Sequence, residues 1–262
     1  MWTQEMFGVE KPIIALLHLD ALPGDPGYCG SMDTVLEHAR QDLVALQNGG
    51  VDGILFANEF SLPYQPVADV AVISAMAYII GALRPLIRVP YGVNVVKNPI
   101  ATIDLAAATG ARFARSCFSG AYMGEYGLYT SNSGEAVRHR KALEIPDMKL
   151  LFKVNPEADS YLVAKSIMFG GFADGLCVSG ASAGSEPDDS ILNKVYEVAK
   201  PRNVPVFCNT GCRHENVREK LKYCDAVCMG TAFKKDGVFN GRVDEERVRS
   251  FMEIVYDIRA RL

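Results

Sequence analysis

Short apolar runs alternate along the chain with segments in which apolar residues recur every three or four positions. Leu36, Ala39, Leu43 and Leu46, for example, share one face of a predicted helix. Apolar runs rich in β-branched residues between such segments are typical of strands in alternating β and α units. The pattern predicts eight strands, at residues 13–19, 52–58, 87–95, 112–117, 149–155, 174–180, 204–210 and 225–231.

The joints between predicted helices and strands repeat weakly. Residues 49–57, 109–117, 170–178 and 222–230 each place the end of a helix directly before a strand. Eight such units in 262 residues match a closed (β/α)8 barrel better than an open sheet, and no GxGxxG follows the first strand. We therefore expect one TIM-barrel domain over residues 1–262. The alternative is a doubly wound sheet, if some of the short runs are not strands.

Composition restricts the partners and the compartment. The formal charge is −4, without a long basic run, which argues against nucleic acid as a partner. Residues 1–10 lack a signal peptide, and the longest uncharged apolar run, Val70–Leu83, is too short to span a bilayer. We expect no transmembrane segment, a buried helix at Val70–Leu83, and a cytoplasmic location.

The seven cysteines fit reduced thiols that pack in the interior. Cys208, Cys212, Cys224 and Cys228 have C-x3-C spacings, which differ from the C-x2-C pairs of common zinc sites. We expect no structural zinc and no obligatory cofactor.

The segment from Val204 to Lys235 contains two short strands that each run into a glycine turn. In a barrel, the turns after the seventh and eighth strands often form a phosphate site. Backbone N–H groups of Thr210, Gly211, Gly230 and Thr231 could converge on an anion, because glycine allows a close approach of the chain.

Lys153 is the sharpest candidate for chemistry, because functional residues of a barrel lie at the C-terminal ends of its strands. It shares strand parity with Leu151 and Asn155, and one of the two faces points inward. A desolvated lysine with a lowered pKa can act as a nucleophile, a base or an anion ligand. The alternatives are an outward side chain between helices, or a simple ion pair with Glu59.

Other strand exits carry further candidates. Glu59 could be a general acid or base, and Arg115 could bind a carboxylate or a second phosphate. His18 could be a base or a packing residue, while Glu59 and Arg115 could equally be a solvated loop residue and a structural ion-pair partner. Additional candidate substrate or phosphate ligands are Asn58, Asn94, Gly180, Ser182, Gly184 and Asn209.

Two loops have compositions that suggest a role at the barrel mouth. Residues 180–189 are small and polar, and Ser182 and Ser185 could donate hydrogen bonds to a phosphate, although the loop could be a plain connection. Residues 118–134 are rich in glycine and tyrosine, and loops of that length are usually functional. This segment either covers the mouth or contacts a second subunit, and we expect a homo-oligomer.

Several motifs resemble the BtpA family over nearly the whole chain: residues 18–26, 48–60, 91–99 and 228–237, followed by 243–252. The resemblance implies a TIM barrel related to the ribulose-phosphate-binding barrels, with phosphate bound after strands seven and eight. Family members are linked to photosystem I biogenesis or belong to gene groups for sugar phosphates. The matching positions are His18, Asn58, Glu59, Asn94, Arg115, Lys153, Gly180, Gly184, Gly211, Gly230 and Thr231.

Three functions follow as hypotheses. The first is an enzyme of the aldolase, isomerase or epimerase kind for a small phosphorylated sugar or polyol, with Lys153 as base or Schiff-base nucleophile and Glu59 or His18 moving protons. The second is a phosphoester or nucleotide hydrolase in which Glu59, Asp20 and Asn58 hold a divalent metal. The third is a non-catalytic assembly factor. Asn155, where we would expect a histidine after Lys153, gives it some support.

Overall fold

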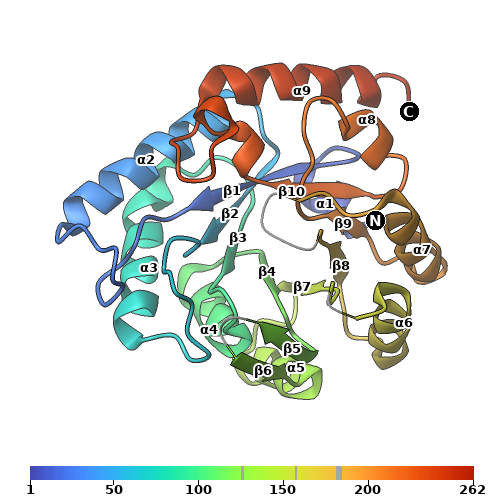
Figure 1. The fold of residues 1–262 in the computed structure, drawn as a ribbon, viewed down its shortest axis with the longest axis horizontal. Helices are drawn as coiled ribbons and strands as arrows, with labels where there is room; N and C mark the ends of the chain where they lie inside the picture. The colour runs from blue at the N-terminus through green and yellow to red at the C-terminus, as the bar shows by residue number, and fades with distance from the viewer. Residues whose placement is uncertain (125–126, 157, 181–184) are drawn as a thin grey trace.

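Eight parallel strands close into a barrel, as Figure 1 shows. The computed structural model describes residues 1–124, 127–156, 158–180 and 185–262. Around the barrel the strands run in the order β1-β10-β9-β8-β7-β4-β3-β2. Their bounds are β1 Ile13–His18, β2 Gly53–Ala57, β3 Tyr91–Asn94, β4 Phe113–Ser116, β7 Lys149–Lys153, β8 Gly175–Val178, β9 Val206–Cys208 and β10 Ala226–Met229. The predicted fold class and all eight predicted strands are confirmed.

Helices form a ring outside the barrel (Figure 1). They are α2 Met32–Asn48, α3 Val70–Leu83, α4 Pro99–Thr109, α5 Ser133–Ala142, α6 Ser160–Gly170, α7 Asp189–Ala199, α8 Val217–Lys220 and α9 Glu245–Arg259. Short 3-10 turns lie at η1 Arg84–Leu86, η2 Lys200–Arg202, η3 Thr231–Phe233 and η4 Lys235–Gly237. In the described part of the chain, no helix has the length and apolarity needed to cross a bilayer.

The start of α2 follows from local sequence, since the Ser31 side chain caps it by accepting a hydrogen bond from the Thr34 backbone N–H. The helix ends at the glycine pair Gly49-Gly50. Gly50 takes the left-handed conformation, with φ of 94°, while Gly49 stays right-handed.

The prediction of a buried helix at Val70–Leu83 is right about the helix and wrong about its burial. Met76 and Ile79 are buried, but Val70 and Tyr78 are 78% and 53% exposed. The reason is geometric, because a helix in the outer ring packs against the barrel along one side and leaves the opposite side open.

The barrel interior is apolar near the N-terminal ends of the strands and polar near their C-terminal ends. Phe113, Leu151 and Phe207 belong to an inner cluster. Trp2 and Phe7, the first and last residues of the short helix α1 (Trp2–Phe7), pack against it. Side chains alternate along a strand, so the inward face continues two residues later to polar positions. Those positions include His18, Asn94, Arg115, Lys153 and Asn209. Lys153 thus faces inward.

The long loop after β4 contains a hairpin that sequence patterning did not predict. Strands β5 Gly120–Gly124 and β6 Gly127–Ser131 pair antiparallel, with Tyr122 opposite Tyr129 and their rings 5.8 Å apart. Both tyrosines line the cavity described below. The hairpin therefore contributes to the wall of the cavity.

We expect Gly92→Ala to lower the free energy of unfolding by about 1–3 kcal/mol, because overpacking strains a filled interior. A Cβ atom at Gly92 would lie 2.3 Å from the Phe113 ring and 2.6 Å from its carbonyl oxygen. Gly81→Ala is the matched control, since nothing lies within 4 Å of its Cβ position in α3, and it should raise stability by roughly 0.5 kcal/mol. Denaturant unfolding measures both. Equal effects of the two substitutions would contradict the packing described for the barrel interior.

Candidate functional site

A cavity of about 650 Å³ opens at the C-terminal mouth of the barrel. Such a volume is typical of pockets for small ligands. The predicted site residues that line it are His18, Glu59, Asn94, Arg115, Lys153, Gly180, Asn209, Thr210, Gly211, Gly230 and Thr231. Ser182 and Gly184 lie outside the described residues. The fold therefore brings together candidates that are far apart in sequence.

Arg115 holds the base of this cavity together. Arg115 is 3% exposed, and its guanidinium donates hydrogen bonds to the Oδ1 atoms of Asn209 and Asn94, each at 2.8 Å. Its Nη2 lies 3.5 Å from Oε1 of Glu59. One planar cation thereby joins the ends of β3, β4 and β9 to the loop after β2. Its Nε has no hydrogen-bond partner among the described residues.

Glu59 is held as a carboxylate. The Tyr64 hydroxyl donates a hydrogen bond to its Oε2 at 2.9 Å. Burial acts to raise the pKa of Glu59, but a charged His18, the Arg115 guanidinium and the Tyr64 hydrogen bond act to lower it, and the net shift is downward. Burial keeps His18 neutral near pH 7, so Arg115 and Tyr64 are the groups that stabilise the carboxylate there. Glu59 is ionised near pH 7, which is the form that can accept a proton.

His18 is almost completely buried, and burial lowers its pKa to about 3. Its ring packs against Phe60 and Phe239, with centroid distances of 5.9 and 5.4 Å. Its Nδ1 has no partner among the described residues. A Cβ atom at Gly230 would lie 2.7 Å from His18 Nε2, so the imidazole explains why glycine stands there. His18 thus packs against two aromatic rings and also lines the cavity, and its role as a base stays a prediction.

Lys153 does not form the ion pair with Glu59 that was one alternative. Glu59 pairs with Arg115 instead. In the described part of the chain, the Lys153 ammonium has no hydrogen bond or ion pair, although it lines the cavity. Its backbone carbonyl accepts a hydrogen bond from the Tyr122 hydroxyl of the hairpin at 3.4 Å. The amine is therefore available to a ligand.

Both glycine turns offer backbone donors to an anion. Within the described residues, the N–H groups of Thr210, Gly211, Gly230 and Thr231 have no acceptor. Gly211 has φ of 66°, and a Cβ atom there would lie 2.2 Å from the backbone of Glu186, so its glycine serves close packing. The Gly180 N–H, at the exit of β8, donates to Oγ1 of Thr210 at 2.8 Å and is thereby engaged.

The prediction that Asn58 binds the substrate is not supported by its position. Its Oδ1 accepts the Val96 N–H at 2.7 Å, and Asn58 is not among the residues that line the cavity. It connects the exits of β2 and β3, as buried amides commonly do when a neighbouring backbone donor needs an acceptor.

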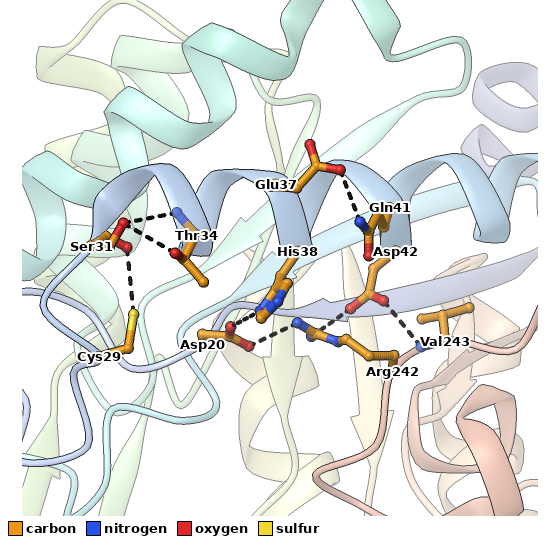
Figure 2. A network of polar contacts seen from close by, with 10 residues as sticks. All are labelled: Asp20, Cys29, Ser31, Thr34, Glu37, His38, Gln41, Asp42, Arg242 and Val243. Atoms are coloured by element: carbon orange, nitrogen blue, oxygen red, sulfur yellow. Dashed lines mark hydrogen bonds and ion pairs between the residues drawn. The ribbon is translucent and has the colours of Figure 1, made fainter.

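Asp20 is also engaged away from Glu59, in the network of Figure 2. Its carboxylate accepts a hydrogen bond from Arg242 at 3.0 Å and lies 2.6 Å from Nδ1 of His38. Asp20 and Asn58 are thus held by other partners, and neither lines the cavity with Glu59, so the described residues do not support the metal site suggested from these three. Among the described residues, no group of three His, Cys, Asp or Glu side chains could hold a metal ion.

The network of Figure 2 supports one wall of the cavity. Arg242 also donates to Asp42 of α2 at 2.7 Å, and the other oxygen of Asp42 accepts the Val243 N–H at 3.0 Å. Burial raises the pKa of Asp42, while Arg242 opposes that shift. These contacts fix the segment between β10 and α9, which contributes Phe239 to the cavity.

Lys234 lies in the same segment, shortly after the end of β10. Nothing in the sequence predicts that its side chain is buried. Its side chain is buried, its Nζ donates to the Phe239 carbonyl at 2.7 Å, and it lies 4.6 Å from the Phe60 ring centroid. Burial lowers its pKa to about 8. The ammonium thus holds Phe239 beside His18.

Several lining residues were not among the predicted site residues. Arg247 comes from α9, and Tyr64 and Arg213 come from loops. Lys97 lies at a strand exit, and Tyr122 and Tyr129 lie in the segment 118–134, which was expected at the mouth without naming individual residues. No sequence signal marks Arg247, because its position on a helix gave no reason to place it at the mouth.

A parallel (β/α)8 barrel with charged residues around its C-terminal mouth defines a TIM-barrel protein. The chain matches the BtpA family over residues 9–257 and belongs to that family. It is 47% identical to the sgc region protein SgcQ of Escherichia coli, covering 98% of this chain and 99% of that one. It is 31% identical to the photosystem I biogenesis protein BtpA of Synechocystis, covering 95% and 89%.

Solved structures share the fold at low sequence identity. One titled "Native KDPGal structure" has a TM-score of 0.60 at 16% identity, covering 96% of this chain and 97% of that chain. Phosphoribosyl anthranilate isomerase from Thermus thermophilus has a TM-score of 0.57 at 14% identity, covering 95% and 100%. N-acetylmannosamine-6-phosphate 2-epimerase from Clostridium perfringens has a TM-score of 0.54 at 14% identity, covering 99% and 96%.

The buried imidazole gives a pH prediction. The folded protein keeps His18 neutral down to about pH 3, whereas the unfolded chain binds a proton near pH 6.5. Stability from this group is thus complete above pH 6.5 and falls by about 1.4 kcal/mol per pH unit below it. Between pH 6 and 4, we expect His18→Gln to make the free energy of unfolding depend less on pH, by up to about 1.4 kcal/mol per pH unit. Urea unfolding across this range measures it, and an unchanged slope would contradict the buried neutral state.

Proposed function

We propose that this protein is an enzyme of the isomerase, epimerase or aldolase kind that acts on a small phosphorylated sugar or polyol. One observation carries the proposal: a carboxylate and a neutral imidazole line the same cavity as a lysine ammonium and two backbone N–H groups that have no partner among the described residues. A base, a cation and an anion-binding turn are the parts such reactions need.

The phosphate would bind at the turn after β10. The N–H groups of Gly230 and Thr231 are available there among the described residues, and Gly211 lies on the neighbouring turn. Holding the phosphate end would place the carbon chain of the sugar across the cavity towards Lys153 and Glu59. Binding energy from the unreactive phosphate would then orient the reacting carbons.

Glu59 would remove a proton from a carbon next to the sugar carbonyl. It is ionised and held by Arg115 and Tyr64, so it starts in the form that accepts a proton. The negative charge that develops on the carbonyl oxygen would be stabilised by the Lys153 ammonium. In an aldolase, a deprotonated Lys153 would instead attack the carbonyl carbon and release water as the Schiff base forms.

His18 would relay a proton rather than carry charge. A neutral imidazole has one donor and one acceptor nitrogen, and Nδ1 is without a partner in the described structure. Because burial strongly disfavours the charged ring, His18 suits hydrogen bonding to a substrate oxygen more than storage of a proton.

The comparisons support the class of substrate without naming the reaction. Two structural neighbours are an N-acetylmannosamine-6-phosphate 2-epimerase and a phosphoribosyl anthranilate isomerase. The family relatives bear names that state no reaction. We also propose a cytoplasmic homo-oligomer, which gel filtration of the purified protein would test.

The direct test is exchange of carbon-bound hydrogen in D₂O, followed by NMR for a panel of phosphorylated aldoses and ketoses. We expect exchange with at least one compound, and Glu59→Gln should slow it by about 10²–10⁴-fold, the usual contribution of a general base. Glu37→Gln, on the outer surface of α2 where Glu37 pairs with Arg40, is the matched control and should leave the rate unchanged.

Other outcomes separate the competing functions. Exchange that survives Glu59→Gln would rule out its role as the base. If no phosphorylated metabolite raises the melting temperature, the non-catalytic assembly factor would replace the enzyme, since a ligand of the folded state must stabilise it. Activity abolished by EDTA would favour the metal-dependent hydrolase.

A further inference from the structure

The cavity carries cationic side chains on two separate sectors of the barrel rim. The described lining includes five cationic residues, Lys97, Arg115, Lys153, Arg213 and Arg247, and two carboxylates, Glu59 and Glu215. An enclosed site with this imbalance favours an anionic ligand. The position of each cation around the barrel indicates how that negative charge is distributed.

One sector lies at the ends of β3, β4 and β7, which are neighbours in the barrel. Arg115 leaves β4 and Lys153 ends β7, while Lys97 follows β3. The Lys153 ammonium has no partner among the described residues. Glu59 offsets only part of this charge, through its 3.5 Å approach to Arg115.

Lys97 adds an independent sign that this rim is functional. Its φ is 61°, a left-handed conformation that costs a lysine about 1 kcal/mol or more. Strained residues of this kind cluster at ligand sites, and Lys97 lines the cavity.

The other sector lies at β9 and β10. Arg247 reaches it from α9, where its Nε donates to the Ala232 carbonyl at 3.1 Å. Its Nη2 is 3.6 Å from the Cβ position of Gly237, another lining residue. In the barrel order, β8 separates β9 from β7, while β1 and β2 separate β10 from β3. The two sectors thus face each other across the mouth.

We propose that the ligand carries two anionic groups, one at each end. A phosphate binds at Arg247 and the turn after β10, and a carboxylate or second phosphate binds at Lys153, Arg115 and Lys97. The substrate class is then a phosphorylated sugar acid or a sugar bisphosphate, rather than a sugar monophosphate with a neutral far end. This deepens the proposed function and rests on its phosphate site.

Calorimetric titration with four compounds tests the proposal at fixed ionic strength. Glucose 6-phosphate and 6-phosphogluconate differ in the charge at C1, fructose 1,6-bisphosphate carries a second phosphate, and gluconate lacks the phosphate. 6-Phosphogluconate and fructose 1,6-bisphosphate each carry two anionic groups and are called doubly anionic here, whereas glucose 6-phosphate and gluconate each carry one. We expect at least one of the two doubly anionic compounds to bind at least tenfold more tightly than glucose 6-phosphate or gluconate. Which of them does so identifies the second group as carboxylate or phosphate.

Two substitutions assign the ends of the ligand. Lys153→Met should reduce the preference for the doubly anionic compound at least fivefold while changing glucose 6-phosphate binding less than twofold. Arg247→Met should weaken all phosphorylated compounds alike. Lys149→Met, at the opposite end of the same strand, and Arg249→Met, paired with Glu245 and Glu246 on the surface of α9, are controls that should change neither.

The possible failures are distinguishable. Equal binding of glucose 6-phosphate and both doubly anionic compounds would overturn the two-anion ligand and leave the phosphate site standing. Equal losses for every compound in Lys153→Met would overturn the assignment of the second group to that sector. If none of the phosphorylated compounds binds, this inference and the proposed function both fail.

Discussion

A buried guanidinium determines how the mouth of this barrel is built. Arg115 points inward from β4, directly above the apolar interior, where an uncompensated charge would cost several kcal/mol. Its hydrogen bonds to Asn94 and Asn209, and its approach to Glu59, supply the compensation. These partners come from the neighbouring strand β3, from the exit of β9 and from the loop after β2, so the requirement to satisfy one cation fixes the relative positions of the candidate groups. Removing any one partner would leave a charge or dipole unmatched.

The same arrangement gives neighbouring titratable groups opposite states. Glu59 is kept ionised by the cation and the Tyr64 hydroxyl, whereas His18, enclosed by Phe60 and Phe239, is kept neutral by burial. Environments that push pKa values in this way commonly distinguish a base from a neutral hydrogen-bonding group. Phe239 is held by Lys234 and lies on the segment anchored by Arg242. The network of Figure 2 therefore positions the ring that packs against His18.

The sequence was most informative where the alternation of side chains along a strand determines which of them face the barrel interior. Alternation along 149–155 placed Lys153 on the same face as Leu151, and the barrel then turned that face inward. Asn58 was assigned to the site from its strand-exit position, but the Val96 N–H takes its side-chain oxygen. That choice depends on where the next strand ends, which no local pattern encodes.

The parts that sequence missed depend on pairing between segments. The hairpin at 120–131 lies in a stretch rich in glycine, and its register places Tyr122 against Tyr129. Arg247 enters the cavity because α9 begins beside the turn after β10. Gly230 was assigned to phosphate binding from its turn, but the nearby His18 imidazole already requires a glycine there.

We propose that one cavity joins a phosphate site to Lys153. A crystal structure of the protein with bound inorganic phosphate tests it most directly. The phosphate should accept hydrogen bonds from the Gly230 and Thr231 N–H groups, beside Arg247, at a distance from the Lys153 Nζ that one small sugar phosphate can span. A phosphate bound elsewhere, or one beyond the reach of such a molecule from Lys153, would contradict the claim.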